Sequence, residues 1–143
     1  MLGMMTLTWA WAENALVLSI GIIDESGAKP RPPQGLPISF SGKLKYLRAA
    51  LRGVSALKHL QDRGTSLMDE LAALADRRNA LIHASIGVSE SGGLESTLFP
   101  KSGGTPARKK VSVAEAVALN IDIDKVSDDV TQFLLSVSKA FHR

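Results

Sequence analysis

Apolar residues recur at three- and four-residue steps along most of the chain, which is the period of an α-helix with one buried side. Typical examples are Trp9, Leu16 and Ile20 near the N-terminus and Val126 and Val130 near the C-terminus. The pattern predicts helices over residues 6–23, 41–61, 67–85, 112–120 and 122–143. The fold class expected is therefore mainly all-α.

Polar residues at the ends of these stretches suggest where each helix begins. The expected N-caps are Thr6 or Thr8, Ser41, Ser66, Ser112 with Glu115 in a capping box, and Asp122. Gly64 is expected to end the second helix, because glycine is common just beyond a helix C-terminus.

Two stretches break the helical period. Residues 24–38 contain four prolines and two glycines, so a stiff loop is expected there. Residues 86–111 alternate imperfectly around Ser91-Gly92-Gly93, which predicts a small β-hairpin or loop insertion after the third helix. The whole chain is then an up-and-down bundle of about four to five helices in a single domain, residues 1–143.

Composition agrees with one globular domain. Of the 143 residues, 45% are hydrophobic and 22% charged, and the net charge is +3, which allows a polyanionic partner without requiring one. The absence of cysteine favours a reducing cytoplasm. The longest uninterrupted apolar or small stretch, 15–23, is too short for a bilayer, and no Lys or Arg precedes the small-x-small stretch at 10–12, so neither a membrane segment nor a signal peptide is expected.

Polar chemistry is densest in the central helix, around Arg78 and His83. Arg78 falls on the stripe that the period reserves for leucines such as Leu74 and Leu81. A guanidinium there is costly unless a carboxylate, a phosphate or a facing subunit satisfies it. This helix is therefore where a functional site is expected.

The stretch Arg78-Asn79-Ala80-Leu81-Ile82-His83 resembles the Arg-polar-x-x-x-His motif of the HEPN superfamily. The resemblance implies a small, commonly dimeric helical bundle, and in many members a metal-independent endoribonuclease. It implies that His83 transfers protons, that Arg78 contacts phosphate, and that Asn79 holds one of the two by hydrogen bonds. It also implies a toxin or defence component with a neutralising antitoxin partner. A nucleotidyltransferase is one candidate for that partner.

Helix geometry adds a constraint. At about 100° per residue, Arg78 and His83 lie about 140° apart around one helix, so they do not meet on an isolated copy. A twofold axis that brings two such helices face to face would gather both residue types around one phosphate. A catalytic interpretation therefore requires a homodimer.

Other residues are candidates for supporting roles. Glu13 is on the same helix side as Trp9, so it could pair with Arg78 or orient His83, or it could bend outward as a first-turn glutamate. Arg77 also fits the looser spacing of the family. Basic residues that could contact RNA, or could simply be solvated, are Lys43, Arg48, Arg108, Lys109 and Lys110.

Two functional classes remain open. One is the endoribonuclease; the other is a non-catalytic HEPN-like dimerisation, nucleotide-binding or regulatory module in which Arg78 and His83 are structural. The three histidines are dispersed at positions 59, 83 and 142, and no glycine pattern forms a phosphate loop, so neither a metal nor a cofactor is expected.

Overall fold

The computed structural model describes residues 2–82, 85–88, 94–98, 104–105 and 107–142. Helices dominate the fold, and the all-α prediction is confirmed. In chain order the elements are α1 (Leu2–Glu25), α2 (Phe40–Gly53), the 3₁₀ helix η1 (Ser55–Leu60), α3 (Gln61–Ile82), β1 (Ser85–Val88), β2 (Leu94–Leu98), β3 (Ala107–Lys110) and α4 (Val113–Phe141).

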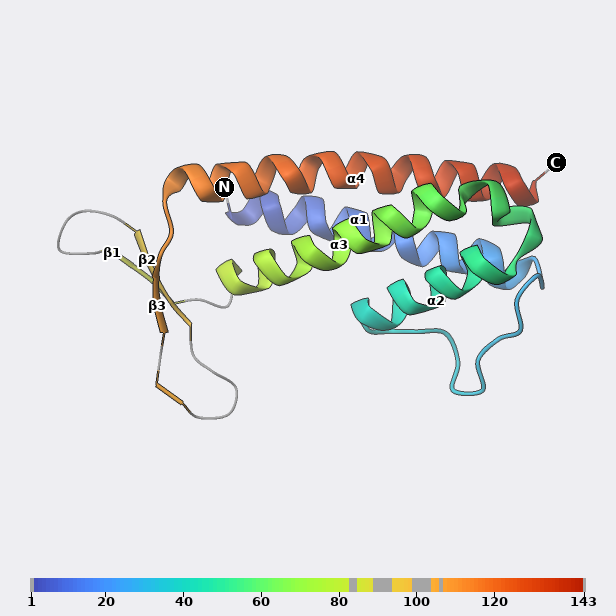
Figure 1. Ribbon diagram of the computed structural model, residues 1–143, viewed down its shortest axis with the longest axis horizontal. Coiled ribbons are helices and arrows are strands. Elements are labelled where there is room, and N and C mark those ends of the chain that lie inside the picture. Colours follow the sequence, from blue (N-terminus) through green and yellow to red (C-terminus); the bar gives the residue numbers. More distant parts are fainter. Residues whose placement is uncertain (1, 83–84, 89–93, 99–103, 106, 143) are drawn as a thin grey trace.

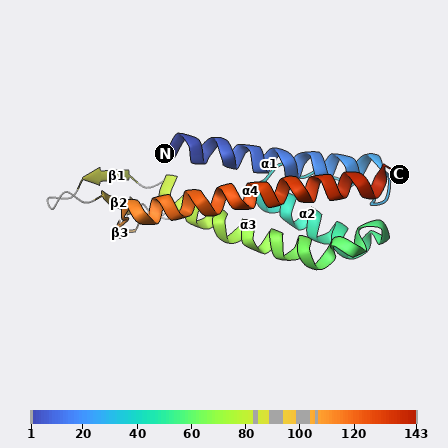
Figure 2. The same ribbon diagram turned by 90° about the horizontal axis from the view of Figure 1, so that it is seen from above.

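The four α-helices pack lengthwise into a bundle (Figures 1 and 2). Helices α1, α2 and α4 run in one direction and α3 runs against them. The long loop between α1 and α2 causes this order, because it carries the chain back along the bundle before α2 begins. Of all the helix pairs, α1 and α4 share the most extensive contact.

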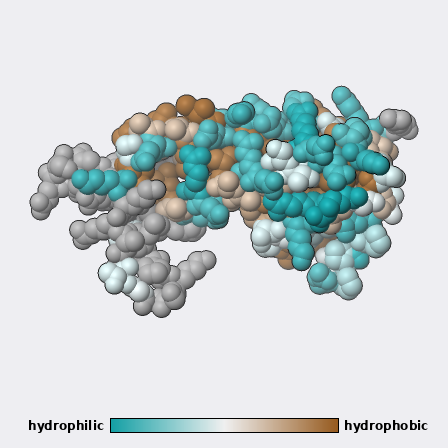
Figure 3. All heavy atoms as spheres, in the orientation of Figure 1, coloured by the Kyte–Doolittle hydropathy of each residue, from teal (hydrophilic) through white to brown (hydrophobic). Residues whose placement is uncertain are grey.

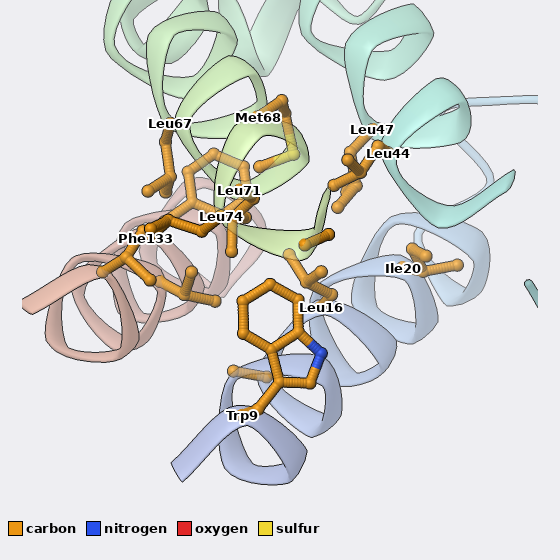
Figure 4. Packing of buried hydrophobic residues seen from close by; sticks show 14 of the residues in the cluster. Trp9, Leu16, Ile20, Leu44, Leu47, Leu67, Met68, Leu71, Leu74 and Phe133 are labelled. Atoms are coloured by element: carbon orange, nitrogen blue, oxygen red, sulfur yellow. The ribbon is translucent and has the colours of Figure 1, made fainter. Parts of the chain in front are cut away.

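The core lies where the four helices meet, as Figure 4 shows around Leu16, Leu47, Leu71 and Phe133. Most of its members are apolar positions that the sequence period selects, but Met5, which precedes the predicted first helix, and Met68 are also fully buried. The largest fully buried side chains are Met5, Leu16, Ile23, Leu47, Leu51, Leu57, Met68, Leu71, Ile123, Val126, Val130 and Val137. Burying side chains of this size is the main favourable term in folding, at roughly 1.5–3 kcal/mol each.

The boundary between the second and third helices differs from the prediction. Helix α2 ends at Gly53, η1 follows, and α3 starts at Gln61 and continues through Gly64. Gly64 is buried, and a Cβ built on it would lie 2.6 Å from Leu51 Cδ1 and 3.0 Å from Phe133 Cε2. Gly64 therefore allows α3 to pack closely against Leu51 and Phe133 and does not end a helix.

Helix caps confirm some predictions and correct others. Ser112 and Glu115 form the predicted capping box, with Glu115 N–H donating to Ser112 Oγ at 3.1 Å and Ser112 N–H donating to Glu115 Oε2 at 2.8 Å. The cap of α2 is Ser39 instead of Ser41, since Ser39 Oγ accepts from Gly42 N–H.

Three further predicted starts are wrong. Thr6 and Thr8 lie inside α1, which begins at Leu2, and Ser66 lies inside α3. Asp122 is also internal, because residues 113–141 form one continuous helix instead of two. Its carboxylate accepts from Arg77 of α3, which gives it a tertiary partner.

The loop between α1 and α2 follows its proline and glycine content. Gly27 and Gly35 adopt positive φ angles of 69° and 88°, a region in which L side chains are strained. Asp24, near the end of α1, pairs with Arg31, whose Nε donates to Asp24 Oδ1 at 3.1 Å. This pair ties the loop to the end of the helix.

Between α3 and α4 the described residues include three short strands. They pair antiparallel in the order β1-β2-β3, with Ile86 opposite Ser96 and Ser96 opposite Lys109. The sheet lies at one end of the bundle, on the side of the N-terminus, while the C-terminus lies at the other end (Figure 1). The predicted turn at residues 91–93 lies outside the described residues.

Helix α1 is unusually apolar along its whole length. Its span Gly3–Glu25, of 23 residues, contains an 18-residue window with a mean hydropathy of 1.3. By length and composition it could cross a membrane, and among the described helices it is the one that meets this criterion. The stretch considered in the sequence, 15–23, was shorter because Glu13 and Asn14 interrupt it. Core helices and signal sequences meet the same criterion, and 39% of that window is buried.

Candidate functional site

Arg78 lies near the C-terminal end of α3 and is partly buried. Its Cζ is 5.4 Å from the centroid of the Trp9 ring, within the range of a cation–π contact. Its Nη1 donates to Asn79 Oδ1 at 3.0 Å, whereas its buried Nε finds no hydrogen-bond partner in the described part of the chain. The guanidinium is therefore held by a ring face and an amide.

Trp9 provides the surface on which this guanidinium rests. The side chain is 2% exposed, and its Nε1–H donates to Glu13 Oε1 at 2.8 Å, one helical turn along α1. On α2, the ring of Phe40 lies 5.3 Å from that of Trp9 at a tilt of 45°. Three helices thus fix the indole, because a side chain from each of them touches it.

Glu13 connects α1 to α2. Its second oxygen, Oε2, lies 3.5 Å from Lys43 Nζ, and its side chain is 34% exposed. Because α1 begins at Leu2, Glu13 is not in the first turn, so the expectation of an outward-bent first-turn glutamate is wrong. The contacts of Glu13 are thus with Trp9 and Lys43, and the expected pair with Arg78 is not among the ion pairs of the described residues. The other expectation, that Glu13 orients His83, concerns a residue outside the described ranges.

Arg77 points away from this group of residues. Its Nη1 donates to Asp122 Oδ2 of α4 at 2.9 Å, and both side chains are about half exposed. The alternative that the motif begins at Arg77 stays a prediction.

The residues expected to bind RNA are not gathered in one place. Lys43 pairs with Glu13, and Arg48 Nη2 pairs with Asp69 Oδ1 of α3 at 2.8 Å. Arg108 and Lys109 lie on β3 with the exposed Lys110, at the end of the bundle. His83 lies outside the described residues.

A shallow groove runs between α2 and α3 beside Arg78. Its volume is about 390 Å³, and it is lined by Phe40, Ser41, Leu44, Arg48, Ala72, Ala75, Asp76 and Asn79. Phe40 and Asn79 belong both to the groove and to the contacts of Trp9 and Arg78. A ligand in this groove would therefore reach the neighbours of the guanidinium.

We name Trp9, Glu13, Phe40, Lys43, Arg78 and Asn79 the Trp9–Arg78 cluster. Its chemistry is that of an anion site, since it offers a positioned cation and an amide beside an apolar wall. Within the described ranges, no group of three or more Asp, Glu or His side chains is placed to hold a metal ion.

Sequence reasoning missed the contacts of Trp9 with Arg78 and Phe40, because it treated Trp9 only as an apolar position of its helix. The one available signal was that Arg78 shares the buried stripe of its helix and so needs a partner on a facing element. The sequence does not indicate which helix supplies that partner, because this depends on how the helices pack.

The chain thus folds as an all-α helical bundle in which the ring of Trp9 supports the partly buried Arg78. Comparisons with protein-family models, curated proteins and solved structures found no match to this chain.

Proposed function

We propose that the protein is a metal-independent RNA endonuclease of the HEPN type, in which Arg78 binds the scissile phosphate and His83 transfers protons. One observation carries this proposal: Arg78 is partly buried and held in place, yet none of the ion pairs among the described residues engages it. A fixed guanidinium without a carboxylate partner is suited to a phosphate, which it can bind with two parallel hydrogen bonds.

The reaction requires no metal ion. The 2′-oxygen of the RNA attacks the adjacent phosphorus, the O2′–P bond forms, and the P–O5′ bond breaks. One proton leaves the 2′-hydroxyl and one reaches the departing 5′-oxygen, and a histidine near its ordinary pKa of about 6.5 can serve in either transfer. The products are a 2′,3′-cyclic phosphate and a 5′-hydroxyl. Arg78 stabilises the charge that develops on the phosphate.

The proposed enzyme acts as a homodimer in the cytoplasm. The helical period of the sequence sets Arg78 and His83 about 140° apart, so in the proposed enzyme the second copy supplies the missing group. Many enzymes of this type are toxic to their own cell, which favours an antitoxin protein as the physiological partner.

A second candidate function is a non-catalytic HEPN-like module for dimerisation, nucleotide binding or regulation. It is favoured by the internal pairing of Lys43 with Glu13 and of Arg48 with Asp69, because these cations are then not free to form a basic wall for RNA. In that case Arg78 and His83 stabilise the bundle or its dimer.

The decisive experiment measures cleavage of an RNA pool in the presence of a chelator. We expect cyclic phosphate ends with the wild type and a loss of about 100-fold or more with His83→Ala or Arg78→Ala. Arg63→Ala is the matched control, since this exposed arginine lies on the same helix at its other end. Cleavage that needs magnesium, or that persists in His83→Ala, would contradict the mechanism; no cleavage by any form would favour the module.

The support of Arg78 by Trp9 is tested by Trp9→Leu. Leucine retains apolar bulk but removes both the ring face and the indole donor to Glu13. We expect weaker RNA binding or cleavage with a folded bundle. Activity equal to that of the wild type would show that the stacking does not position the guanidinium.

A further inference from the structure

The loop between α1 and α2 runs beside α2 (Figure 1), and together they line another cavity. Its volume is about 410 Å³, within the usual range of small-molecule sites. The residues that line it lie between positions 29 and 38 in the loop and between positions 42 and 49 on α2. The groove beside Arg78 shares none of them, so this cavity is a separate feature of the molecule.

Part of the cavity lining is apolar. It includes Leu36, Pro37 and Ile38 of the loop and Ala49 of α2, and Ile38 is 90% exposed. Figure 3 shows mostly hydrophilic side chains over this end of the bundle, on the face that it draws. The apolar lining is therefore a local feature, which suits the apolar part of a small ligand. A ligand that covers Ile38 would remove that side chain from water.

Two lysines contribute positive charge to the same cavity. Lys29 in the loop is partly buried, and Lys45 on α2 is exposed. Within the described part of the chain neither lysine has a carboxylate partner, and none of the described lining residues is Asp or Glu. The carboxylate of Asp24, at the end of α1, is already paired with Arg31. The charge that complements this cavity is therefore negative.

Tyr46 holds one of these charges at the cavity. Its side chain is also part of the lining, and Lys29 Nζ lies 4.8 Å from the centroid of its ring, which is a cation–π contact. The ring is well supported, because Tyr46 is 5% exposed. Its hydroxyl has no hydrogen-bond partner among the described residues, so Tyr46 also retains an unused donor. The ammonium of Lys29 is thus kept beside the lining instead of extending into water.

We propose that this cavity binds a small organic anion, in which a carboxylate or phosphate group is joined to an apolar body. The anionic group lies between Lys29 and Lys45, and the apolar body covers Leu36 and Ile38. A lysine ammonium binds either oxyanion through charge-assisted hydrogen bonds, and the apolar lining adds affinity by removing carbon from water. Because the site is apart from the Trp9–Arg78 cluster, binding here does not depend on the proposed RNA cleavage.

A nuclear magnetic resonance titration of the isotope-labelled full chain tests the site directly. The probes are octanoate and octyl phosphate, which differ in the anionic group, and the comparison compounds are octan-1-ol and inorganic phosphate. We expect at least one of the two probes to shift the amide signals of Gly35, Ile38 and Gly42 saturably, and its headgroup is then the one that the site prefers. Octan-1-ol and inorganic phosphate should bind about tenfold more weakly or worse, because each lacks one of the two interactions.

Three results of this titration would overturn the proposal. Equal affinity for octan-1-ol would show that the lysine charges play no part, and equal affinity for inorganic phosphate would show that the apolar lining plays none. Saturable shifts with neither probe, or shifts confined to α1 and α4, would show that this cavity is not the binding site.

Charge variants test the two lysines. We expect Lys29→Ala and Lys45→Ala each to weaken binding of the preferred probe by about 3- to 10-fold, and Lys45→Arg to retain most of the affinity because arginine keeps the charge. Lys125→Ala is the matched control, since this exposed lysine lies on α4 and is not among the lining residues, and its affinity should equal that of the wild type. An equal loss in Lys125→Ala, or unchanged affinity in both Lys29→Ala and Lys45→Ala, would also overturn the proposal.

Discussion

The Arg78 guanidinium lies against a single aromatic ring, that of Trp9, and donates to Asn79 Oδ1. The indole is buried, oriented by Glu13 and covered in part by Phe40. An arginine that lacks a carboxylate partner would ordinarily extend into water, but the ring face makes partial burial acceptable. The side chain is therefore held in place by groups of the protein itself.

Tyr46 is the only tyrosine in the chain and is 5% exposed, and no hydrogen-bond partner for its hydroxyl is found among the described residues. Burial, and secondarily the nearby Asp24 carboxylate, raises the pKa of Tyr46 above 10.0. Because the folded-state pKa is the higher one, stability is unaffected below pH 10.0 and falls as the pH rises from there through the folded-state pKa.

We expect a titration of tyrosinate absorbance in the near ultraviolet to show this directly. The midpoint for the folded protein should lie above that of the chain unfolded in guanidinium. Equal midpoints in the two states would mean that Tyr46 is solvated.

Gly64 is a second residue whose role depends on its neighbours. We expect Gly64→Ala to lower the free energy of unfolding by about 1–3 kcal/mol, because its Cβ would overlap Leu51. Gly53→Ala is the control: it meets nothing within 4 Å and should be neutral or slightly stabilising. Chemical denaturation of both variants measures the difference, and equal effects would contradict the close packing at Gly64.

At the scale of elements, side-chain caps mark the starts of α2 and α4. Ser39 caps α2, and the Ser112–Glu115 capping box starts α4. These short-range contacts were open to prediction in part: the box was identified correctly, whereas the start of α2 was placed at Ser41 instead of Ser39.

We expect Ser112→Ala to destabilise the protein by about 1 kcal/mol, because it leaves the Glu115 N–H without its acceptor. Ser136 lies inside the same helix and bonds only to Gln132 O, so Ser136→Ala should change stability little. Thermal unfolding followed by circular dichroism compares the two. A loss for Ser136→Ala as large as for Ser112→Ala would argue against a capping effect.

Helix lengths were harder to predict than helix positions. Asp122 has the residue type of a cap, yet it lies within α4 and pairs with Arg77 of α3. Capping preference is worth only about 1 kcal/mol, so continuous packing of a long helix overrides it.

At the scale of the whole molecule, one core spans all four helices, so a defect in it should affect the entire bundle. Leu71 is fully buried, and we expect Leu71→Ala to cost about 2–5 kcal/mol in a single cooperative transition. Ile38→Ala, at a residue 90% exposed, should stay within about 0.5 kcal/mol of the wild type. Urea denaturation measures both, and a small effect at Leu71 would mean that the core rearranges around the cavity.

The two sides of α1 have different chemistry, and this arrangement emerges only for the assembled bundle. One side packs on α2 and α3 and carries Trp9, while the other adjoins α4 and leaves Leu7 and Trp11 exposed. The sequence period identifies a helix here, but a helix that is apolar all round does not indicate which side the fold covers.

The sequence by itself determined the helical class of the fold, the buried stripes, the proline-rich loop and the capping box at Ser112, because these depend on contacts within a few residues of chain. Tertiary structure decided that α3 continues through Gly64, that Asp122 pairs with Arg77 and that Arg78 lies against Trp9. It also decided which large hydrophobic side chains of α1 and α4 are exposed. Each of these joins residues from different helices, and the free energy of such contacts exists only once the helices have packed.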